Sequence, residues 1–470
     1  MAAPDGLRAA TEAARELKAT MRGRVLMAGD EAYDTGLRLW NGAVERRPAV
    51  LARCADPADA QAAVRIARTH ELPLSVRGGG HDWAGRALRH GGLVIDLSEL
   101  RQVTVDASNG IASAGGGATA GGLVDAAGRH GLVTATGSVG KVGMAGLTLA
   151  GGYGPLDGRF GLALDNLVSA DVVLADGRQV TASDAEDADL LWALRGSGGN
   201  FGVLTGARYR LHPLASVLAG LLVYPLSDAE AVLNGSSAML ARAPDELSIS
   251  AGFLGRADGP VLFLFPTWSG EPAAGEPLLA EVQRLGTPLS AQVSPMPYAD
   301  VLGLFDQEVV DGRHYWIETR WLPKMTESAV DVLVAAAGRL TSPFSMLNVK
   351  PFHGAAARVP SDSTAFALRR DHLLVEIIAA WEPAGDPAAD GSRHVDWARR
   401  TDAELSPIAL PGGYPNLLAP DEHDRSRLAY GGNATRLLQL ERRYDPDMVF
   451  ASAAGIVSTV QTPLTRRARS

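Results

Sequence analysis

Apolar residues recur at intervals of three and four in several segments of this chain, the spacing of one helix face. Near the N-terminus, residues 7–21 show this spacing and predict a helix. A second helix is predicted from Pro57 to about residue 67, because Asp56 can cap its first turn and proline fits there. The same reasoning predicts further helices at residues 120–129, 187–194, 327–340, 395–405 and 433–444.

Aliphatic and aromatic runs bounded by turn residues predict strands. Asp176-Gly177 separates the runs 172–175 and 179–181, which predicts a hairpin with a tight turn. After His212-Pro213 the glycine clusters thin out and the strands lengthen, a pattern typical of an antiparallel sheet covered by helices. The other predicted strands are residues 93–97, 111–114, 218–224, 247–253, 261–265 and 373–381.

Residues 314–321 alternate as a strand would, with Tyr315, Ile317, Thr319 and Trp321 on one face. The other face would carry His314, Trp316, Glu318 and Arg320. Such a strand is either an ordinary amphipathic element or part of a pocket for an aromatic or polyketide-like substrate. The sequence leaves both readings open.

Composition and charge exclude several classes of protein. The chain has 470 residues, which indicates two or three domains, and its 46% hydrophobic and 21% charged residues are typical of a globular protein. A net charge of −9 argues against a nucleic-acid partner, and the one basic cluster is the tail Arg466, Arg467 and Arg469. The single cysteine, Cys54, cannot form a disulfide within the chain or a cysteine-based metal site, and no metal is expected.

The N-terminal residues, up to about Asp34, contain no apolar core of a secretory signal. No run approaches the length of a membrane-spanning helix, so no membrane partner is expected. These features predict a cytoplasmic location.

Three glycine-rich loops carry the candidate chemistry. The first, Arg77-Gly78-Gly79-Gly80-His81-Asp82, follows a strand-like run and lets consecutive backbone amides approach a phosphate. The second covers residues 137–161 and the third residues 196–202. None ends in Gly-Lys-Ser/Thr or forms a clean Gly-x-Gly-x-x-Gly at the start of a long helix, which disfavours two common nucleotide folds. One such loop is most often a turn, but three together predict an extended diphosphate cradle.

Residues 77–81, 137–154 and 192–205 resemble the PCMH-type flavin-binding domain of the vanillyl-alcohol oxidase superfamily. Tyr414-Pro415-Asn416 and Tyr430-Gly431-Gly432-Asn433 resemble the terminal motif of its berberine-bridge-enzyme-like branch. The resemblance implies an α+β fold in four parts. These are an N-terminal helical segment (1–45), a two-subdomain FAD-binding domain (46–214), an antiparallel-sheet substrate domain covered by helices (215–410) and a segment returning to the FAD domain (411–458).

The same resemblance implies FAD as cofactor and aligns His81 with the histidine that bonds the 8α-methyl carbon of the flavin. The FAD-contacting residues that it implies are Arg77, Gly78, Gly79, Gly80, Asp82, Gly137, Ser138, Val142, Gly143, Gly146, Gly152, Asn200, Gly202, Val203 and Asn416. Doubly linked members carry a cysteine at the position of Val139. Since valine has no nucleophile, a single covalent link is predicted.

Glu376 is the one charged residue in an aliphatic run, where an uncompensated charge would be costly, and it is a candidate base. An edge-strand or ion-paired glutamate is the alternative. Tyr430 aligns near a tyrosine that is the base in some relatives, although core packing is equally consistent with its position. Lys350, His353 and Tyr153 are further pocket candidates.

The resemblance implies hydride transfer from a small organic substrate to flavin N5, with molecular oxygen reoxidising the flavin and yielding hydrogen peroxide. An oxygenating or oxidative-cyclising enzyme of natural-product biosynthesis is the first alternative. A non-catalytic flavoprotein is the second.

Overall fold

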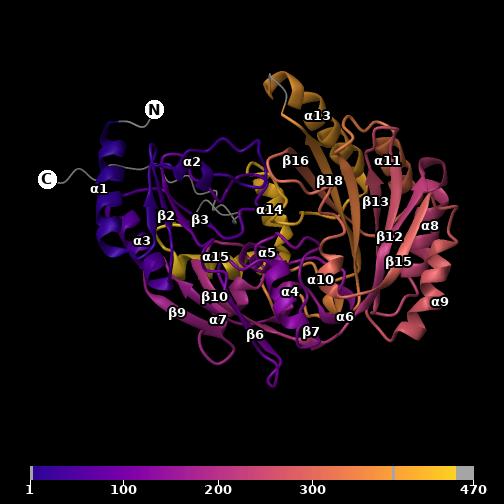
Figure 1. The fold of residues 1–470 in the computed structure, drawn as a ribbon, viewed down its shortest axis with the longest axis horizontal. Coiled ribbons are helices and arrows are strands. Elements are labelled where there is room, and N and C mark those ends of the chain that lie inside the picture. The colour runs from indigo at the N-terminus through magenta and orange to yellow at the C-terminus, as the bar shows by residue number, and fades with distance from the viewer. Residues whose placement is uncertain (1–3, 384–386, 451–470) are drawn as a thin grey trace.

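The computed structural model describes residues 4–383 and 387–450. Two small sheets occupy the N-terminal half of the fold and one large sheet occupies the other half (Figure 1). Helices and strands are mixed in both halves, which confirms the predicted α+β class.

The first sheet has four strands in the order β1-β2-β4-β3. β2 and β3 run parallel to β4, whereas β1 runs antiparallel to β2. The Asp56 carboxylate accepts the Asp59 amide at 3.1 Å, which confirms the predicted cap of α3. The elements of this part are α1 (Pro4–Thr20), β1 (Arg24–Leu26), α2 (Tyr33–Gly36), β2 (Val50–Arg53), α3 (Pro57–Thr69), β3 (Leu74–Arg77) and β4 (Leu93–Asp96).

The second sheet is antiparallel, with the strand order β5-β6-β10-β8-β9. β8 and β9 form the predicted hairpin around Asp176-Gly177, although β8 begins at Leu167, earlier than predicted. Its strands are β5 (Val103–Asp106), β6 (Ile111–Gly115), β8 (Leu167–Val173), β9 (Gln179–Ser183) and β10 (Val203–Arg210), and the helices of this region include α4 (Ala120–Gly128), α5 (Met144–Ala150), α6 (Asp157–Phe160) and α7 (Ala188–Leu194). A short pair, β7 (Leu132–Val133) and β11 (His212–Pro213), closes this region.

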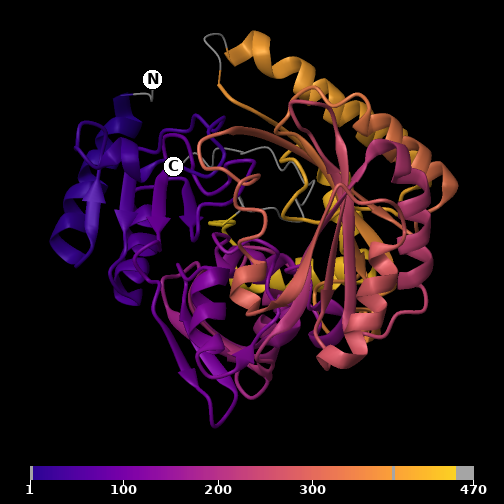
Figure 2. The ribbon, with the colours of Figure 1, turned by 45° about the vertical axis from the view of Figure 1, so that its right-hand side comes forward.

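The third sheet has seven strands in the order β15-β12-β14-β13-β17-β18-β16, and every neighbouring pair is antiparallel. Helices α8, α9, α11 and α13 cover its outer side (Figure 2); the sequence predicted an antiparallel sheet covered by helices but located only α11 and α13. The strands are β12 (Val217–Pro225), β13 (Leu247–Leu254), β14 (Val261–Trp268), β15 (Ser290–Met296), β16 (His314–Leu322), β17 (Met346–Phe352) and β18 (His372–Trp381). The helices are α8 (Ala229–Leu240), α9 (Pro272–Gln283), α11 (Glu327–Ala337) and α13 (Pro387–Leu405), the last longer than predicted.

Alternation along the central strands gives this sheet two different faces. Leu347, Val349, Val375 and Ile377 belong to the apolar core shared with the covering helices. Their neighbours Met346, Lys350, Glu376 and Ile378 line a cavity instead. The sheet therefore separates a helix-packed core from the site described below.

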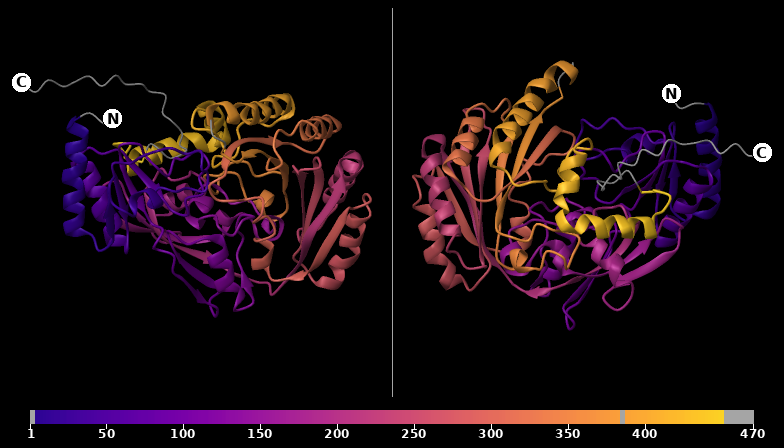
Figure 3. Two further views of the ribbon diagram at one scale, coloured as in Figure 1. Left: turned by 45° about the horizontal axis from the view of Figure 1, so that its top comes forward. Right: turned by 180° about the vertical axis from the view of Figure 1, so that it is seen from behind.

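The C-terminal helix α15 (Ala434–Tyr444) lies across the N-terminal half, whereas α14 (His423–Ala429) lies between the two halves, where Arg425 donates to the Thr319 carbonyl of β16 (Figure 3). α15 packs against α7, and Arg436 forms an ion pair with Asp189 at 2.7 Å. The predicted boundaries at residues 45, 214, 410 and 458 stay predictions. Residues 451–458 and the basic tail Arg466, Arg467 and Arg469 lie outside the described residues.

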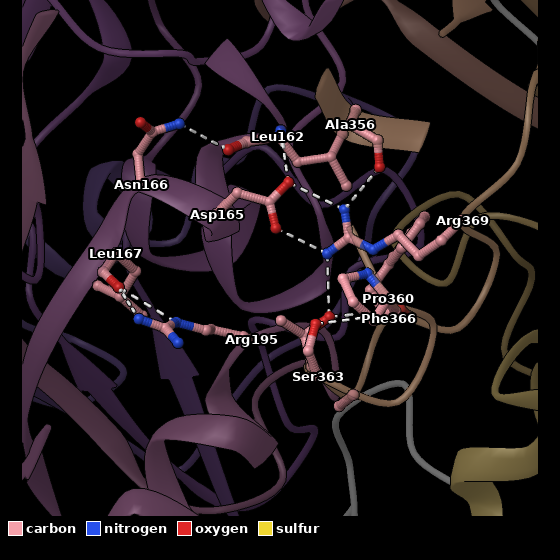
Figure 4. Close-up of polar contacts among 12 residues, drawn as sticks. Leu162, Asp165, Asn166, Leu167, Arg195, Ala356, Pro360, Ser363, Phe366 and Arg369 are labelled. Atoms are coloured by element: carbon pink, nitrogen blue, oxygen red, sulfur yellow. Dashed lines mark hydrogen bonds and ion pairs between the residues drawn. The ribbon is translucent and has the colours of Figure 1, made fainter. Parts of the chain in front are cut away.

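A buried ion pair fixes the segment before β18 to the residues that follow the second glycine-rich loop. Arg369 donates to both carboxylate oxygens of Asp165 at 2.9 and 2.7 Å, and also to Thr364 and the Ala356 carbonyl (Figure 4). The Arg369 side chain is fully buried, so losing one partner would leave an uncompensated charge.

Across the part of the chain that the structure describes, no helix has the length and apolarity to span a membrane.

Candidate active site

A cavity of about 350 Å³ lies between the glycine-rich loops, the inner face of the large sheet and residues 414–417. The fold brings most of the residues predicted to contact a cofactor together on its wall. They are Gly78, Gly79, Gly80, His81, Asp82, Gly137, Ser138, Val142, Gly143, Gly146, Gly202 and Asn416. The candidate base Glu376 lines the same cavity, as do Lys350, Tyr153, Tyr315 and Ile317.

Two glycine loops meet backbone to backbone at the cavity wall. A Cβ atom at Gly79 would lie 2.5 Å from the amide nitrogen of Gly143, and one at Gly143 would lie 2.5 Å from that of Gly79. No real Cβ atom tolerates such a distance, so both positions require glycine. Gly80 adds a φ of +71°, which favours glycine as well.

We expect Gly79→Ala to lose most of its bound flavin, because the two loops must separate to admit the methyl group. Overpacking of this kind costs about 1–3 kcal/mol of folding free energy. Gly128→Ala is the control, since its Cβ would meet nothing within 4 Å and alanine favours the helix by up to about 1 kcal/mol. Flavin absorbance per protein and thermal unfolding measure both effects. Normal flavin content in Gly79→Ala would contradict the tight contact.

His81 is held in a stack of aromatic rings. Its ring lies 4.3 Å from that of Trp40 at 12°, and Trp40 lies 3.9 Å from Tyr315 at 22°. Burial lowers the pKa of His81 to about 4, so the imidazole is neutral at physiological pH. Its Nε2 is buried and has no hydrogen-bond partner among the described residues. Because His81 lines the cavity, its neutral imidazole, with one nitrogen that bonds no protein group, is suited to bond a ligand there.

Arg86 joins the His81 loop to the C-terminal segment. Its guanidinium pairs with Asp82 at 2.8 Å and donates to the carbonyls of Pro415 and Asn416 at 3.4 and 2.9 Å. Asn416 in turn donates to the Gly146 carbonyl at 3.1 Å. These contacts join the His81 loop, Gly146 and residues 415–416, and they close the cavity on that side.

Four predicted cofactor residues do not line the cavity, because they support its loops from behind. Arg77 donates to the carbonyls of Gly36 and Arg38, and the Gly152 amide donates to the Tyr414 hydroxyl at 3.0 Å. The Asn200 side chain donates to the Ser197 carbonyl at 3.3 Å, while Val203 is fully buried in an apolar core.

The position of Tyr430 does not favour its predicted role as a base. Its side chain is 1% exposed in the apolar core, its hydroxyl donates to the Ser197 carbonyl at 3.2 Å, and it does not line the cavity. His353 is also absent from the lining and packs beside Gly158. The alternative reading of Tyr430 as a core residue therefore describes the structure better.

Glu376 lies in an ion-paired network on the inner face of the large sheet. One carboxylate oxygen accepts from the Lys350 ammonium and the other from the Asn348 amide, both at 2.9 Å. The register of β17 and β18 places Asn348 directly opposite Glu376. The carboxylate is compensated and fixed, yet it still faces the cavity.

Tyr414 lines the cavity. It belongs to the Tyr414-Pro415-Asn416 motif, of which only Asn416 was predicted to be a site residue. Its hydroxyl accepts from the Gly152 amide, and burial raises its pKa to about 12. Its neighbour Tyr153 also lines the cavity and hydrogen-bonds His372 at 2.8 Å. Trp40 and Arg86 have no recognisable motif of their own, so nothing in the sequence singled them out.

The residues present fit FAD. Gly78, Gly79, Gly80, Gly143 and Gly146 line the cavity with backbone that a diphosphate could approach, and His81 lines the same wall with one nitrogen that bonds no protein group. Among the described residues no cluster of three or more His, Cys, Asp or Glu is arranged to hold a metal ion. The glycine-lined cavity, the sheet beside it and the Lys350–Glu376 ion pair at its wall are the features of a flavin-dependent oxidoreductase site.

Comparison with known proteins agrees with that class. Residues 48–183 match the family model "FAD binding domain" and residues 413–457 match "Berberine and berberine like". The chain belongs to the berberine-bridge-enzyme-like FAD-linked oxidoreductases, which have PCMH-type FAD-binding domains of the vanillyl-alcohol oxidase family.

Similar relatives span nearly the whole chain. The FAD-linked oxidoreductase pgmH of Aspergillus terreus is 30% identical and covers 95% of this chain and 96% of its own. The (R)-6-hydroxynicotine oxidase of Paenarthrobacter nicotinovorans is 30% identical, with 92% and 96% covered. The crystal structure of 6-hydroxy-D-nicotine oxidase from Arthrobacter nicotinovorans superposes with a TM-score of 0.84 at 29% identity over 93% of this chain and 98% of its own.

Proposed function

We propose that this protein is an oxidase that carries FAD joined covalently through His81 alone and oxidises a small organic molecule. The observation that carries this proposal is a single cavity lined by both His81 and Glu376. One residue offers a free imidazole nitrogen and the other a carboxylate. The sequence relative named (R)-6-hydroxynicotine oxidase supports the reaction class.

The chain's own residues would hold FAD in a defined way. Gly78, Gly79 and Gly143 would place backbone against the diphosphate, and His81 would bond the flavin ring. Val139 lines the cavity without a nucleophile, so a second link has no donor there. When bound, FAD supplies a two-electron acceptor that takes a hydride from the substrate and passes the electrons to oxygen, which leaves as hydrogen peroxide.

Glu376 would take the substrate proton. Lys350 and Asn348 hold the carboxylate in place, and each carboxylate oxygen keeps a lone pair beyond its present hydrogen bond, so it can still accept a proton. The buried position limits exchange of that proton with bulk water. Glu376 would accept the substrate proton and FAD the hydride. No second charged side chain is then needed at the substrate carbon that is oxidised.

The test is a balance of flavin, oxygen and peroxide. Purified protein should be yellow and should keep its flavin after acid precipitation. Oxidation of a substrate in air should consume one molecule of oxygen and release one molecule of hydrogen peroxide per product. Oxygen uptake without peroxide would overturn the oxidase proposal in favour of oxygenating chemistry. Colourless protein that does not take up FAD would overturn both the oxidase proposal and the oxygenating alternative.

A further inference from the structure

Charged side chains that line the cavity are all neutralised by ion pairs. Among the described residues these side chains are Asp82, Arg86, Glu308, Lys350 and Glu376. Asp82 pairs with Arg86 at 2.8 Å, Glu308 with Arg256 at 3.1 Å and Lys350 with Glu376 at 2.9 Å. The described wall therefore presents no uncompensated charge to a substrate.

A substrate ion would gain little from this wall. An ammonium group near the inner sheet face would be attracted by Glu376 and repelled by Lys350, and a carboxylate would meet the opposite pair of forces. Removing either ion from water is costly unless a counter-charge is free to pair with it. The paired arrangement therefore favours a neutral molecule.

Several side chains on the large-sheet side of the cavity are apolar. Val309, Ile317, Phe344, Met346 and Ile378 line the cavity from β16, β17, β18 and the adjoining loops. Phe344 is 37% exposed, and the Arg313 guanidinium lies over its ring at 4.1 Å. Burial of an apolar body against these side chains supplies the driving force for binding.

Lys350 and Glu376 offer a donor and an acceptor side by side. The ammonium has three hydrogens, and the structure commits one of them to Glu376. A hydroxyl group can accept from Lys350 and donate to Glu376 at the same time. An ether or a hydrocarbon would leave one or both of these polar groups unsatisfied.

We infer that the substrate is a neutral, largely apolar alcohol whose carbinol carbon is oxidised to a carbonyl. This inference rests on the proposed function and adds its substrate class. The hydroxyl proton passes to Glu376, and the carbinol hydrogen leaves with its electron pair to the FAD of the proposed function. One two-electron oxidation therefore yields a neutral aldehyde or ketone, and oxygen is the final acceptor.

The test compares three molecules of one shape and different charge. They are 1-(2-naphthyl)ethanol, the ammonium form of 1-(2-naphthyl)ethylamine and 2-(2-naphthyl)propanoate. Dissociation constants come from perturbation of the flavin spectrum under anaerobic conditions with the holoenzyme. The alcohol should bind at least tenfold more tightly than either ion. Equal or tighter binding of an ion, or no binding of the alcohol, would overturn the inference.

Charge variants give a second, directional readout. Lys350→Met leaves Glu376 unpaired and should shift preference at least tenfold toward the ammonium, whereas Glu376→Gln should shift it toward the carboxylate. The double variant Lys350→Met/Glu376→Gln is uncharged at both positions and should still bind the alcohol in preference to either ion. It provides the measurement if a single variant does not fold. Lys324→Met, at an exposed lysine, is the control and should change nothing. Unchanged ranking in folded single variants would contradict the inference.

Failure of this inference differs from failure of the proposed function. Acid-stable flavin and peroxide release test the oxidase, and the ranking of the three ligands tests the substrate class. An enzyme that carries covalent flavin but prefers the ammonium would still support the oxidase proposal and would contradict the inferred substrate class.

Discussion

Replacing His81 with alanine is expected to abolish covalent attachment of the flavin while leaving the protein folded. The glycine cradle and the C-terminal segment do not depend on the imidazole, so FAD should still bind reversibly. Turnover should fall by about tenfold or more, which corresponds to about 1.4 kcal/mol in the barrier. The reason is that an electron-withdrawing substituent at the 8α carbon makes the flavin a stronger oxidant, and the variant lacks it.

Mass spectrometry gives a direct measurement of this link. Trypsin cleaves after Arg77 and Arg86, so residues 78–86 form one peptide that contains His81. In the native protein this peptide should carry the added mass of the flavin, and acid precipitation should release no flavin. In His81→Ala all flavin should appear in the supernatant.

His130→Ala is the matched control, because His130 is exposed and does not line the cavity. It should retain full covalent flavin. Acid-stable flavin in His81→Ala would show that another residue forms the bond, and an unmodified peptide in active native protein would show that no bond forms at His81. Either result would overturn attachment through His81 and leave the FAD-binding class intact.

The sequence predicted His81 and Glu376 for reasons that are local. Three adjacent glycines before a histidine are an unusual pattern, and so is one acidic residue inside an aliphatic strand. Each pattern can be recognised within a stretch of a few residues. Their partners are set by tertiary contacts. Trp40 stacks on His81 from a segment before the first parallel strand, and Asn348 reaches Glu376 through the register of β17 with β18.

The missed elements have physical explanations too. β15 has an exposed and intermediate burial pattern with no buried position, so it lacks the apolar alternation that predicts a strand. Tyr430 follows α14, and its environment depends on whether that helix end faces the cavity or the core. A motif alone does not contain that information, whereas the packing against Ser197 does.

Replacing Glu376 with glutamine is expected to lower kcat by about 10²–10⁴-fold, the range of a lost general base. Glutamine has nearly the same shape and can still accept from Lys350, and the Asn348 amide can turn its oxygen toward the new NH2 group. The variant therefore removes the proton acceptor with little change in packing. Flavin content and the acid stability of its attachment should match those of the native protein.

Tyr430→Phe separates the two candidate bases that the sequence suggested. The Tyr430 hydroxyl makes one buried hydrogen bond, to the Ser197 carbonyl, so its loss should cost about 1 kcal/mol of stability. Its kcat should stay within about twofold, since the side chain does not line the cavity. Rapid anaerobic reduction of the flavin measures the chemical step in both variants, and it should be slowed in Glu376→Gln alone. Reduction as fast as native in Glu376→Gln would show that proton removal does not use this carboxylate, and the ion pair with Lys350 would then serve only to orient the substrate.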